Sequence, residues 1–537
     1  MAAEQPHVAA VKIPRRRTKD GFIDYLTLNF AELDAEVDAW CARLAKQEVQ
    51  HGDRVLVMVQ PGLSLIAVAF ALFRYGTIPV FIDPGMGRDS FLTCVSRAKP
   101  RVLVGTFKAR IASRIFRSAF SSVEVRVPAS SSLCARLTKA GARGRGPRYE
   151  TAIAAGTDLA AILFTSGSTG APKGVRYEHG MFEAQIRLIR ATYGIEPGEI
   201  DLPLLPIFAL FNPALGMTTV VPEIDPRHPA TVDPAKIVQA IQQEKVTNSF
   251  GSPTLWKKIG DHCIANKITL PSVRRVLCAG APVPASLWET SRQFLTQGQL
   301  HSPYGATEAL PITTISAREM ESLSGLGACV GKPLAEMDVK IVVSSDERLA
   351  TLADTQELRR GGIGEIIVRG PVVTKVYDDN PPATTAAKIA YSQNFTMAAG
   401  VWHRMGDCGY VDEEGRIWFC GRKVERVDTA EATLYTEPCE QVFRVHPRAA
   451  RCALIGLGER GRQIPAIVVE TQLKNSADGI ALARELHALA VANEQTARIK
   501  TFFFRPQFPV DVRHNAKIHR LALARWAATA KAYEMSE

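Results

Sequence analysis

The sequence predicts an α/β fold in which helices and strands alternate along the chain. Apolar residues recur at helical spacing in some segments and form short continuous runs, typical of buried strands, in others. In the first part of the chain we expect helices at residues 33–44 and 63–75 and strands at residues 54–59, 77–82 and 101–105. This alternation favours mainly parallel sheets with helices packed on their faces.

The length of the chain, 537 residues, predicts more than one domain, because a single hydrophobic core seldom organises so many residues. We expect a large domain over residues 1–421 and a small C-terminal α/β domain over residues 422–537. The elements expected in the small domain are helices near residues 438–445 and 480–493 and strands near residues 451–455, 466–470 and 500–504.

The composition is that of an ordinary globular protein, with 46% hydrophobic and 22% charged residues. The formal net charge is +11. The basic residues are scattered and accompany no nucleic-acid-binding signature, so nucleic acid is not expected as a partner. The basic residues between positions 136 and 148 fit either a solvated loop or a docking patch for an acidic partner.

The sequence gives no reason to expect export or insertion into a membrane. Its ten cysteines are dispersed without a Cys-x-x-Cys pair, which favours reduced thiols. The basic stretch at residues 15–17 is followed by no apolar segment of the signal-peptide type. The longest apolar run, residues 63–73, is too short to span a bilayer. We therefore expect a cytoplasmic protein without a transmembrane segment.

A segment rich in glycine and hydroxyl residues follows a strand expected at residues 159–164. Its glycines let the backbone approach an anion closely, and its serines, threonines and lysine supply hydrogen-bond donors and a positive charge. These properties suit a polyphosphate group, although the spacing is not that of the P-loop. The candidate nucleotide-binding residues in it are Thr165, Ser166, Gly167, Ser168, Thr169, Gly170 and Lys173.

Two further segments carry residues suited to a nucleotide. In the stretch Tyr304-Gly305-Ala306-Thr307-Glu308, an aromatic ring can stack on a base, a hydroxyl can donate to the α-phosphate and a carboxylate can hold Mg²⁺. About one hundred residues later comes Trp402-His403-Arg404-Met405-Gly406-Asp407, whose final carboxylate can accept two hydrogen bonds from a vicinal diol.

These segments resemble, in order along the chain, the motifs of the adenylate-forming superfamily of acyl-CoA synthetases, peptide-synthetase adenylation domains and luciferases. The resemblance implies ATP and Mg²⁺ as cofactors, an acyl-AMP intermediate, and a small C-terminal domain that acts as a mobile lid. It also implies that Gly280, Ala281 and Pro282 border the adenine. Asp407 is implied to bind both ribose hydroxyls, and Arg422 to contact the ribose.

The same resemblance implies catalytic roles for three residues. Thr307 and Glu308 act at the phosphates, and Glu308 is the implied metal ligand. Lys517 lies in Asn515-Ala516-Lys517-Ile518 and matches the lysine that neutralises the reacting carboxylate during adenylation.

An aromatic stretch at residues 206–211 stands where members of the superfamily line their acyl pocket. A pocket lined by Phe208, Phe211 and Met217 would suit a fatty chain. These three residues fit an ordinary hydrophobic core equally well.

The chain departs from thioester-forming members at two positions. Val424 replaces a charged hinge residue, and Glu431 stands where a glycine usually borders the pantetheine tunnel. A carboxylate there would repel an incoming thiolate, which argues against a CoA step.

Three short stretches resemble the subgroup of olefin-biosynthesis β-lactone synthetases: residues 179–185, 435–440 and 514–518. This resemblance implies ATP-dependent activation of a 2-alkyl-3-hydroxyalkanoic acid, followed by closure of its own β-hydroxyl onto the activated carboxyl group. The products are a β-lactone, AMP and diphosphate. It also implies assembly with the other olefin-pathway enzymes, namely a thiolase-like enzyme, a reductase and an α/β-hydrolase.

Two other functions remain open on the sequence alone. One is a fatty acyl-CoA or acyl-carrier-protein ligase of the same fold, and the other is a nucleotide-binding scaffold without catalysis. For the group that deprotonates the β-hydroxyl, Asp428, Glu431 and a histidine are all candidates.

Overall fold

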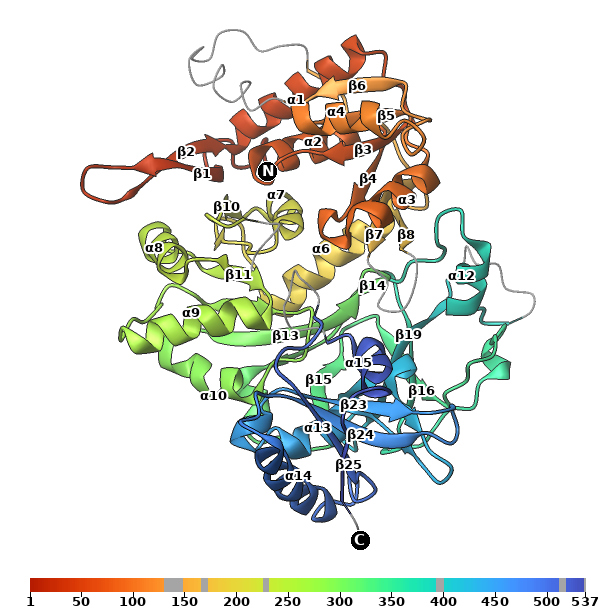
Figure 1. Ribbon diagram of the computed structural model, residues 1–537. Helices are drawn as coiled ribbons and strands as arrows, with labels where there is room; N and C mark the ends of the chain where they lie inside the picture. The colour runs from red at the N-terminus through yellow and green to blue at the C-terminus, as the bar shows by residue number, and fades with distance from the viewer. Residues whose placement is uncertain (130–147, 166–171, 226–230, 393–399, 511–517, 536–537) are drawn as a thin grey trace.

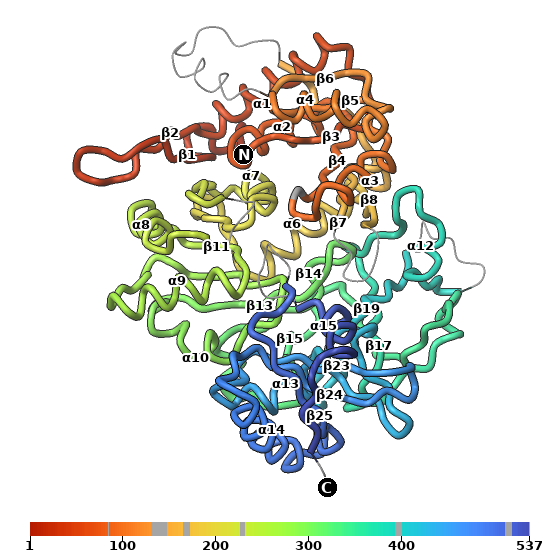
Figure 2. Tube along the Cα trace, in the orientation of Figure 1, coloured from red at the N-terminus to blue at the C-terminus, as the bar shows by residue number. Residues whose placement is uncertain are grey.

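The computed structural model describes residues 1–129, 148–165, 172–225, 231–392, 400–510 and 518–535. Two large sheets with their helices form the body of the molecule, and a smaller sheet built by the C-terminal residues lies against it (Figure 1). The tube view shows the course of the chain from red at the N-terminus to blue at the C-terminus (Figure 2): β1 and β2 belong to the second large sheet, β3 to β8 to the first, and β9 to β20 to the second again.

The first large sheet has six strands in the order β6-β5-β3-β4-β7-β8. Neighbouring strands pair in parallel, except that β7 and β8 are antiparallel. The strands are β3 (Arg54–Met58), β4 (Ile78–Ile82), β5 (Val102–Gly105), β6 (Val125–Pro128), β7 (Leu159–Thr165) and β8 (Lys173–Glu178). The strands expected up to residue 164 are therefore present.

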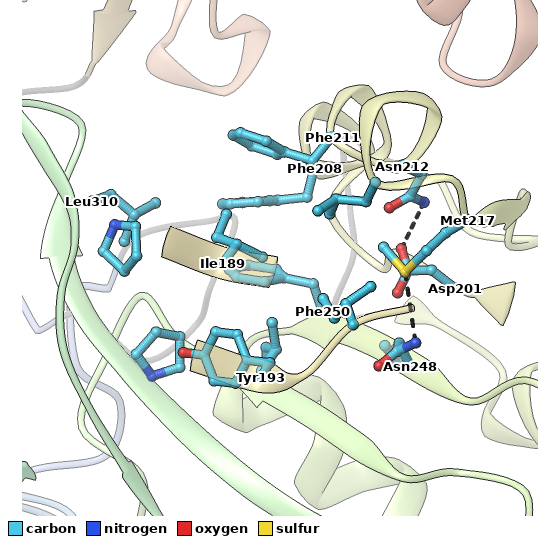
Figure 3. Close-up of a pocket in the computed structure, with 16 residues that line it drawn as sticks. Ile189, Tyr193, Asp201, Phe208, Phe211, Asn212, Met217, Asn248, Phe250 and Leu310 are labelled. Carbon is cyan, nitrogen blue, oxygen red and sulfur yellow. Dashed lines mark hydrogen bonds between the residues drawn. The ribbon is translucent and has the colours of Figure 1, made fainter. Parts of the chain in front are cut away.

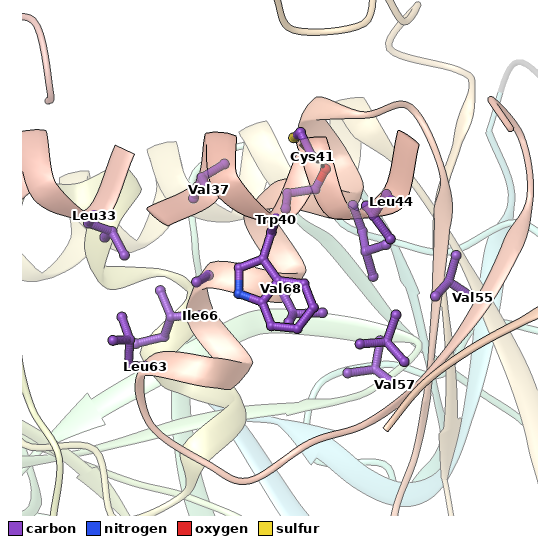
Figure 4. Close-up of a cluster of buried hydrophobic side chains, with 14 of the residues drawn as sticks. Leu33, Val37, Trp40, Cys41, Leu44, Val55, Val57, Leu63, Ile66 and Val68 are labelled. Carbon is purple, nitrogen blue, oxygen red and sulfur yellow. Dashed lines mark hydrogen bonds between the residues drawn. The ribbon is translucent and has the colours of Figure 1, made fainter. Parts of the chain in front are cut away.

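Helices α1 (Phe30–Lys46) and α2 (Leu63–Arg74) supply a buried apolar cluster beside this sheet (Figure 4). Helix α1 begins at Asn29, whose side chain accepts a hydrogen bond from Glu32 N while the Glu32 side chain accepts one from Asn29 N. This capping box satisfies backbone groups that the first turn would otherwise leave unpaired. Trp40 and Leu44 then point from α1 into the cluster.

The second sheet has fourteen strands, in the order β16-β17-β19-β20-β15-β14-β13-β12-β11-β9-β10-β1-β2 with β18 beside β19. Pairing is parallel from β13 through β12, β11, β9 and β10 to β1, and antiparallel elsewhere in this sheet. The expected α/β fold is thus confirmed, and the parallel pairing stops at the β13–β14 hairpin.

The strands of the second sheet are β1 (Ala9–Arg17), β2 (Ile23–Asn29), β9 (Ile200–Asp201), β10 (Thr218–Val220), β11 (Asn248–Gly251), β12 (Arg275–Cys278), β13 (Gln299–Ala306), β14 (Ala309–Ser316), β15 (Ala328–Pro333), β16 (Asp338–Val342), β17 (Gly364–Arg369), β18 (Lys388–Ile389), β19 (Trp402–Val411) and β20 (Ile417–Arg422). The remaining helices of the body are α3 (Arg88–Ala98), α4 (Phe107–Ile115), α6 (His179–Tyr193), α7 (Asn212–Leu215), α8 (Pro234–Glu244), α9 (Pro253–Ala265), α10 (Ala285–Phe294), α11 (Ala317–Met320) and α12 (Pro381–Ala387).

The C-terminal residues build a four-stranded sheet in the order β23-β24-β25-β26. Its strands are β23 (Cys452–Leu457), β24 (Ile464–Glu470), β25 (Thr501–Arg505) and β26 (Tyr533–Glu534), and its helices are α13 (Thr436–Phe443), α14 (Ser476–Val491) and α15 (Arg520–Ala527). A short hairpin of β21 (Val427–Asp428) and β22 (Thr433–Leu434) precedes them.

Helix α13 joins this unit to the body. Its Thr436 hydroxyl donates to Cys420 O at 3.4 Å on β20. The Gln441 side chain accepts from Gly327 N at 3.1 Å and donates to Gly325 O at 3.4 Å.

A buried ion cluster ties three elements of the C-terminal unit together. The Glu440 carboxylate on α13 accepts from Arg520 Nε at 2.8 Å and Nη2 at 2.9 Å, from Arg444 Nη2 at 2.7 Å, and from Leu454 N at 2.9 Å on β23. Glu440 is fully buried, and a buried carboxylate is tolerated only when charged donors surround it in this way. Arg520 therefore anchors the chain three residues after Lys517.

Candidate active site

The hairpin between β13 and β14 carries four of the expected site residues, Tyr304, Gly305, Thr307 and Glu308. The carbonyl group of Thr307 accepts a hydrogen bond from the Tyr177 hydroxyl on β8 at 2.5 Å. The hairpin leaves no room for a larger residue at Gly305, where a Cβ would lie 2.5 Å from Ala309 O.

The side chain of Glu308 is held by a second tyrosine. The Tyr377 hydroxyl donates to Glu308 Oε1 at 2.8 Å, and the backbone N–H of Thr374 donates to Glu308 O at 2.9 Å. Both bonds come from the chain after β17. The carboxylate is thereby fixed in orientation and keeps acceptor capacity for a further ligand.

Two buried or half-buried lysines lie against the Tyr377 ring. Lys173 Nζ is 5.0 Å and Lys388 Nζ is 5.8 Å from its centroid. Lys388 is 4% exposed, and its ammonium donates to the carbonyl and the hydroxyl of Thr374. Burial lowers the pKa of Lys388 to about 7. The motifs in the sequence contained Lys173 and Glu308, but not Tyr377 or Lys388.

On the other side of the hairpin, Asp407 is bound by two expected site residues. The Tyr304 hydroxyl donates to Asp407 Oδ2 at 2.6 Å, and Arg422 Nη1 donates to Asp407 Oδ1 at 2.7 Å. Asp407 is 4% exposed, and its negative charge raises the pKa of Arg422. A carboxylate presents two oxygens that accept hydrogen bonds, which is what binding of a vicinal diol requires.

Several expected residues lie elsewhere or outside the described part. Gly280, Ala281 and Pro282 form a turn after β12, the strand that pairs with β13, and Gly280 adopts a positive φ of 97° that favours glycine. Thr165 ends β7 and pairs with Lys173 at the start of β8. The residues between them that were expected to bind phosphate, Ser166, Gly167, Ser168, Thr169 and Gly170, lie outside the described residues, as does Lys517.

The expected acyl-pocket residues Phe208, Phe211 and Met217 line one cavity (Figure 3). Its empty volume is about 600 Å³, part of which is open to solvent. Phe208 stacks on Phe250, with ring centroids 3.6 Å apart, and Leu310 and Pro311 line the end that belongs to β14. The cavity therefore extends to within three residues of Thr307 along the chain.

A buried acid stands at the other side of this cavity. Asp201 on β9 is 5% exposed and accepts from Asn212 Nδ2 at 2.8 Å. Burial raises the pKa of Asp201 to about 7. The sequence did not reveal Asp201, since nothing marks a single acidic residue in a short strand as part of a pocket.

Asp428 and Glu431, the two carboxylates named as candidates to deprotonate the β-hydroxyl, lie in the β21–β22 hairpin. Partial burial would raise the pKa of Asp428, but hydrogen bonds from Arg460 at 2.8 Å and from Thr433 at 2.9 Å lower it. Glu431 lies exposed in the turn, 3.2 Å from Arg498 Nε. Val424 is in a single 3₁₀ turn, Lys423–Glu425, directly after β20.

The sequence profile of AMP-binding enzymes matches residues 2–378. The chain belongs to the AMP-binding enzyme family. It is 43% identical to an olefin beta-lactone synthetase of Stenotrophomonas maltophilia (strain K279a) and 42% identical to one of Xanthomonas campestris pv. campestris, in both cases over 98% of this chain and 96% of the relative.

The structure of the O-succinylbenzoate coenzyme A synthetase MenE of Bacillus subtilis, solved with ATP and magnesium ion, has a similar fold. The TM-score is 0.74, with 22% identity over 97% of this chain and 98% of that one. As a member of the AMP-binding enzyme family, the protein is an AMP-forming ligase with the adenylate-forming fold, as the sequence predicted. No helix of the described residues is long and apolar enough to cross a membrane.

Proposed function

We propose that the protein is an ATP-dependent β-lactone synthetase that acts on a 2-alkyl-3-hydroxyalkanoic acid in olefin biosynthesis. The observation that carries this proposal is the similarity to two olefin beta-lactone synthetases over 98% of the chain. The cavity beside the β13–β14 hairpin supports it, because its largely apolar wall, which includes Leu310 and Pro311 of β14, suits an alkyl chain.

The nucleotide would lie along the hairpin. Asp407, fixed by Tyr304 and Arg422, would accept both ribose hydroxyls. Gly280, Ala281 and Pro282 would border the adenine, together with Tyr304, and Thr307 would donate to the α-phosphate. Residues 165–170 and Lys173 would bind the β- and γ-phosphates.

The side chains at the hairpin fit a Mg²⁺ site in which substrate phosphates supply most of the ligands. Such a site needs only one or two carboxylates from the protein. Glu308 would supply that carboxylate, oriented by Tyr377. When bound, the ion would neutralise phosphate charge. Among the described residues no cluster of three or more metal-ligating side chains offers an alternative site.

Chemically, the first step exchanges a poor leaving group for a good one. The carboxylate attacks the α-phosphate, diphosphate leaves and an acyl-AMP mixed anhydride forms. Lys517 would neutralise the carboxylate in this step. The substrate's β-hydroxyl oxygen then bonds to the carboxyl carbon, and the bond from that carbon to the phosphate oxygen breaks. AMP leaves, and its phosphate group takes up the hydroxyl proton. The nucleophile is part of the substrate, so orientation replaces a second substrate.

We further propose that residues 1–421 form the adenylation domain and residues 422–537 a mobile lid that delivers Lys517. The buried Glu440–Arg520 pair would keep the lid segment anchored close to that lysine. The protein would work in the cytoplasm beside the other olefin-pathway enzymes, a thiolase-like enzyme, a reductase and an α/β-hydrolase.

The test compares a 3-hydroxy acid with a matched acid that lacks the hydroxyl, each with ATP and Mg²⁺, with and without CoA. The proposal predicts AMP, diphosphate and a β-lactone from the hydroxy acid without CoA. The deoxy acid should stop as enzyme-bound acyl-AMP, because it has no nucleophile. Mass analysis that finds a CoA thioester formed equally from both acids would instead identify an acyl-CoA ligase.

A further inference from the structure

Helix α4 carries three large apolar side chains on the surface of the molecule. Phe107 and Ile115 are each 68% exposed, and Ile111 is 40% exposed. Because these residues recur every four positions, they form one row along the outer face of the helix, which we call the apolar row. Single exposed apolar residues are common, whereas an aligned group of them is typical of an interaction site.

The opposite face of α4 fixes the helix on its sheet. Ala109 and Ser113 are buried, and the Ser113 hydroxyl accepts a hydrogen bond from Arg126 Nε on β6 at 3.0 Å. The helix begins at Thr106, whose hydroxyl accepts from Ala109 N at 3.3 Å. The packing of this inner face therefore holds the apolar row outward.

Basic side chains lie along both sides of the apolar row. Successive residues of a helix are about 100° apart around its axis, so Arg110 and Arg114 flank the row on one side and Lys108 on the other. The Arg110 guanidinium lies 5.8 Å from the centroid of the Phe107 ring. Lys108 and Arg114 are exposed, and neither forms an ion pair with another described residue. The sequence contains no aspartate or glutamate from residue 106 to residue 123.

We propose that this face of α4 binds the surface of a membrane that contains anionic lipids. The apolar row would enter the boundary between headgroups and acyl chains, and the flanking cations would contact lipid phosphates. An anionic bilayer presents negative charge over its whole area, with hydrocarbon directly beneath. It therefore complements both the charge and the apolar side chains of this face.

The size of the face favours a lipid surface over an acidic protein. The apolar row and its four cations, Lys108, Arg110, Arg114 and Arg117, make seven residues on and directly after one helix. A stable protein interface uses about 20–30 residues on each side and depletes charged residues at its core. A fluid lipid surface requires only an exposed apolar row with cations beside it.

The position of α4 is compatible with a mobile C-terminal lid. The helix packs on β5 and β6 at the edge of the six-stranded sheet, and the C-terminal unit lies at the opposite end of the molecule (Figure 1). A membrane bound at α4 would therefore leave the lid free. Under the proposed function the substrate is an amphiphilic acid that partitions into lipid, so attachment would bring the enzyme to its substrate. Binding itself does not depend on that function.

The test measures flotation of the full-length protein with vesicles of phosphatidylglycerol or of phosphatidylcholine. We expect binding to the anionic vesicles alone, and it should weaken as the ionic strength rises. Lys108→Glu combined with Arg114→Glu should weaken binding at least about tenfold, because each basic residue near an anionic surface contributes about a fivefold factor. Phe107→Ser combined with Ile115→Ser should also weaken it at least about tenfold, since it removes the side chains that enter the bilayer.

Two further variants are matched controls. Lys236→Glu combined with Arg484→Glu makes the same change in net charge at exposed positions of α8 and α14. Val445→Ser removes an apolar side chain that is 72% exposed in the C-terminal unit. Both controls should bind the vesicles like the wild type. Urea unfolding should be unchanged in all four variants, because each replaced side chain is at the surface.

Equal binding to the two kinds of vesicle, or binding to neither, would overturn the inference. Binding by the α4 variants that matches that of the controls would overturn it as well. Binding to poly-glutamate without binding to vesicles, lost in the charge variant and kept in the apolar variant, would identify an acidic protein as the partner instead. A wild type that binds anionic vesicles through α4 but forms no lactone would overturn the proposed function and support this inference.

Discussion

The proposed ribose side of the candidate site, around Asp407, is fixed by charged hydrogen bonds, whereas the proposed acyl side, the cavity around Phe208, is fixed by stacked rings. Asp407 is bound by Tyr304 at 2.6 Å and Arg422 at 2.7 Å. Phe208 packs on Phe250 with ring centroids 3.6 Å apart. Hydrogen bonds to a charged group are directional and lose much of their energy if one partner is removed. Packing is distributed over many weak contacts, so a truncated ring weakens the site gradually.

The two sides therefore recognise their ligands in different ways. The ribose side can recognise two hydroxyl groups at fixed positions through hydrogen bonds. The acyl side can read only length and shape, because an apolar wall discriminates weakly between chains that differ by one methylene group. Substitutions on the two sides should therefore change different quantities, the affinity for ATP on one side and the KM of the acid on the other. A substitution that acts on the reacting carboxylate should change the rate of adenylation and neither of these two.

The largest effect is expected from Lys517→Ala, because this variant removes the charge that we propose neutralises the reacting carboxylate. ATP–pyrophosphate exchange should fall by at least about 100-fold, the usual cost of losing one group that stabilises transition-state charge. The dissociation constant of ATP should change little. Lys531→Ala, an exposed lysine in the same C-terminal unit, is the control. Near-normal exchange by Lys517→Ala would remove Lys517 from the reaction.

Asp407→Ala should act on the nucleotide alone. Losing the acceptor for the ribose diol should weaken ATP binding by about 1.5–3 kcal/mol, and the KM of the acid at saturating ATP should stay the same. Calorimetric titration with ATP measures the first quantity. Asp338→Ala, which breaks the exposed pair with Arg369, should leave ATP binding unchanged. If both variants bound ATP like the wild type, Asp407 would not contact the ribose.

Phe208→Ala should change the KM of the acid and leave the affinity for ATP unchanged. Removing a stacked ring costs about 0.5–1.5 kcal/mol beyond the lost area, so the KM of a long-chain acid should rise by up to about tenfold. ATP binding should be unchanged. Steady-state kinetics over a series of chain lengths would show the effect growing with the chain. An equal effect on acids of every length would indicate that Phe208 supports the fold and does not line the acyl path.

The sequence names candidate residues for both sides, but it distinguishes a ligand-binding role from a structural one only on the proposed ribose side. Tyr304 and Asp407 stand in short motifs whose residue types suit a nucleotide, whereas the role expected of Arg422 comes from the resemblance to the superfamily. Phe208 is predicted equally well as core or as pocket lining, because burial by protein and burial by a ligand require the same apolar side chain.

The supporting contacts were beyond the reach of the sequence for a different reason. The bond from Tyr177 to Thr307 joins residues 130 positions apart, and that from Gln185 to Leu310 joins residues 125 positions apart. Helical or strand periodicity reports only on neighbours within an element. The alternation of helices and strands could therefore be predicted from the sequence. The side chains that surround the hairpin could be found only in the tertiary structure: Tyr177, Tyr377, Lys388 and Gln185.

The smallest expected effect concerns the acid in the acyl cavity and appears in stability. Burial raises the pKa of Asp201 to about 7, whereas an aspartate in the unfolded chain has a pKa of about 3.9. The folded state therefore binds the proton more tightly, and the stability that this provides is lost as the pH rises through 7. Between pH 6 and pH 8 the free energy of unfolding should fall by about 1 kcal/mol through this group.

Asp201→Asn should abolish this loss, because an amide stays neutral and can still accept the hydrogen bond from Asn212. Urea unfolding of wild type and variant at pH 6 and pH 8 isolates the contribution, since all other titrating groups are shared. The wild type should lose stability relative to the variant at the higher pH. This result would fit an acyl side that disfavours a charge, in contrast to the ribose side, where Asp407 is charged. Parallel pH dependence of the two proteins would show that Asp201 ionises normally, and the cavity would then tolerate a charge next to its apolar wall.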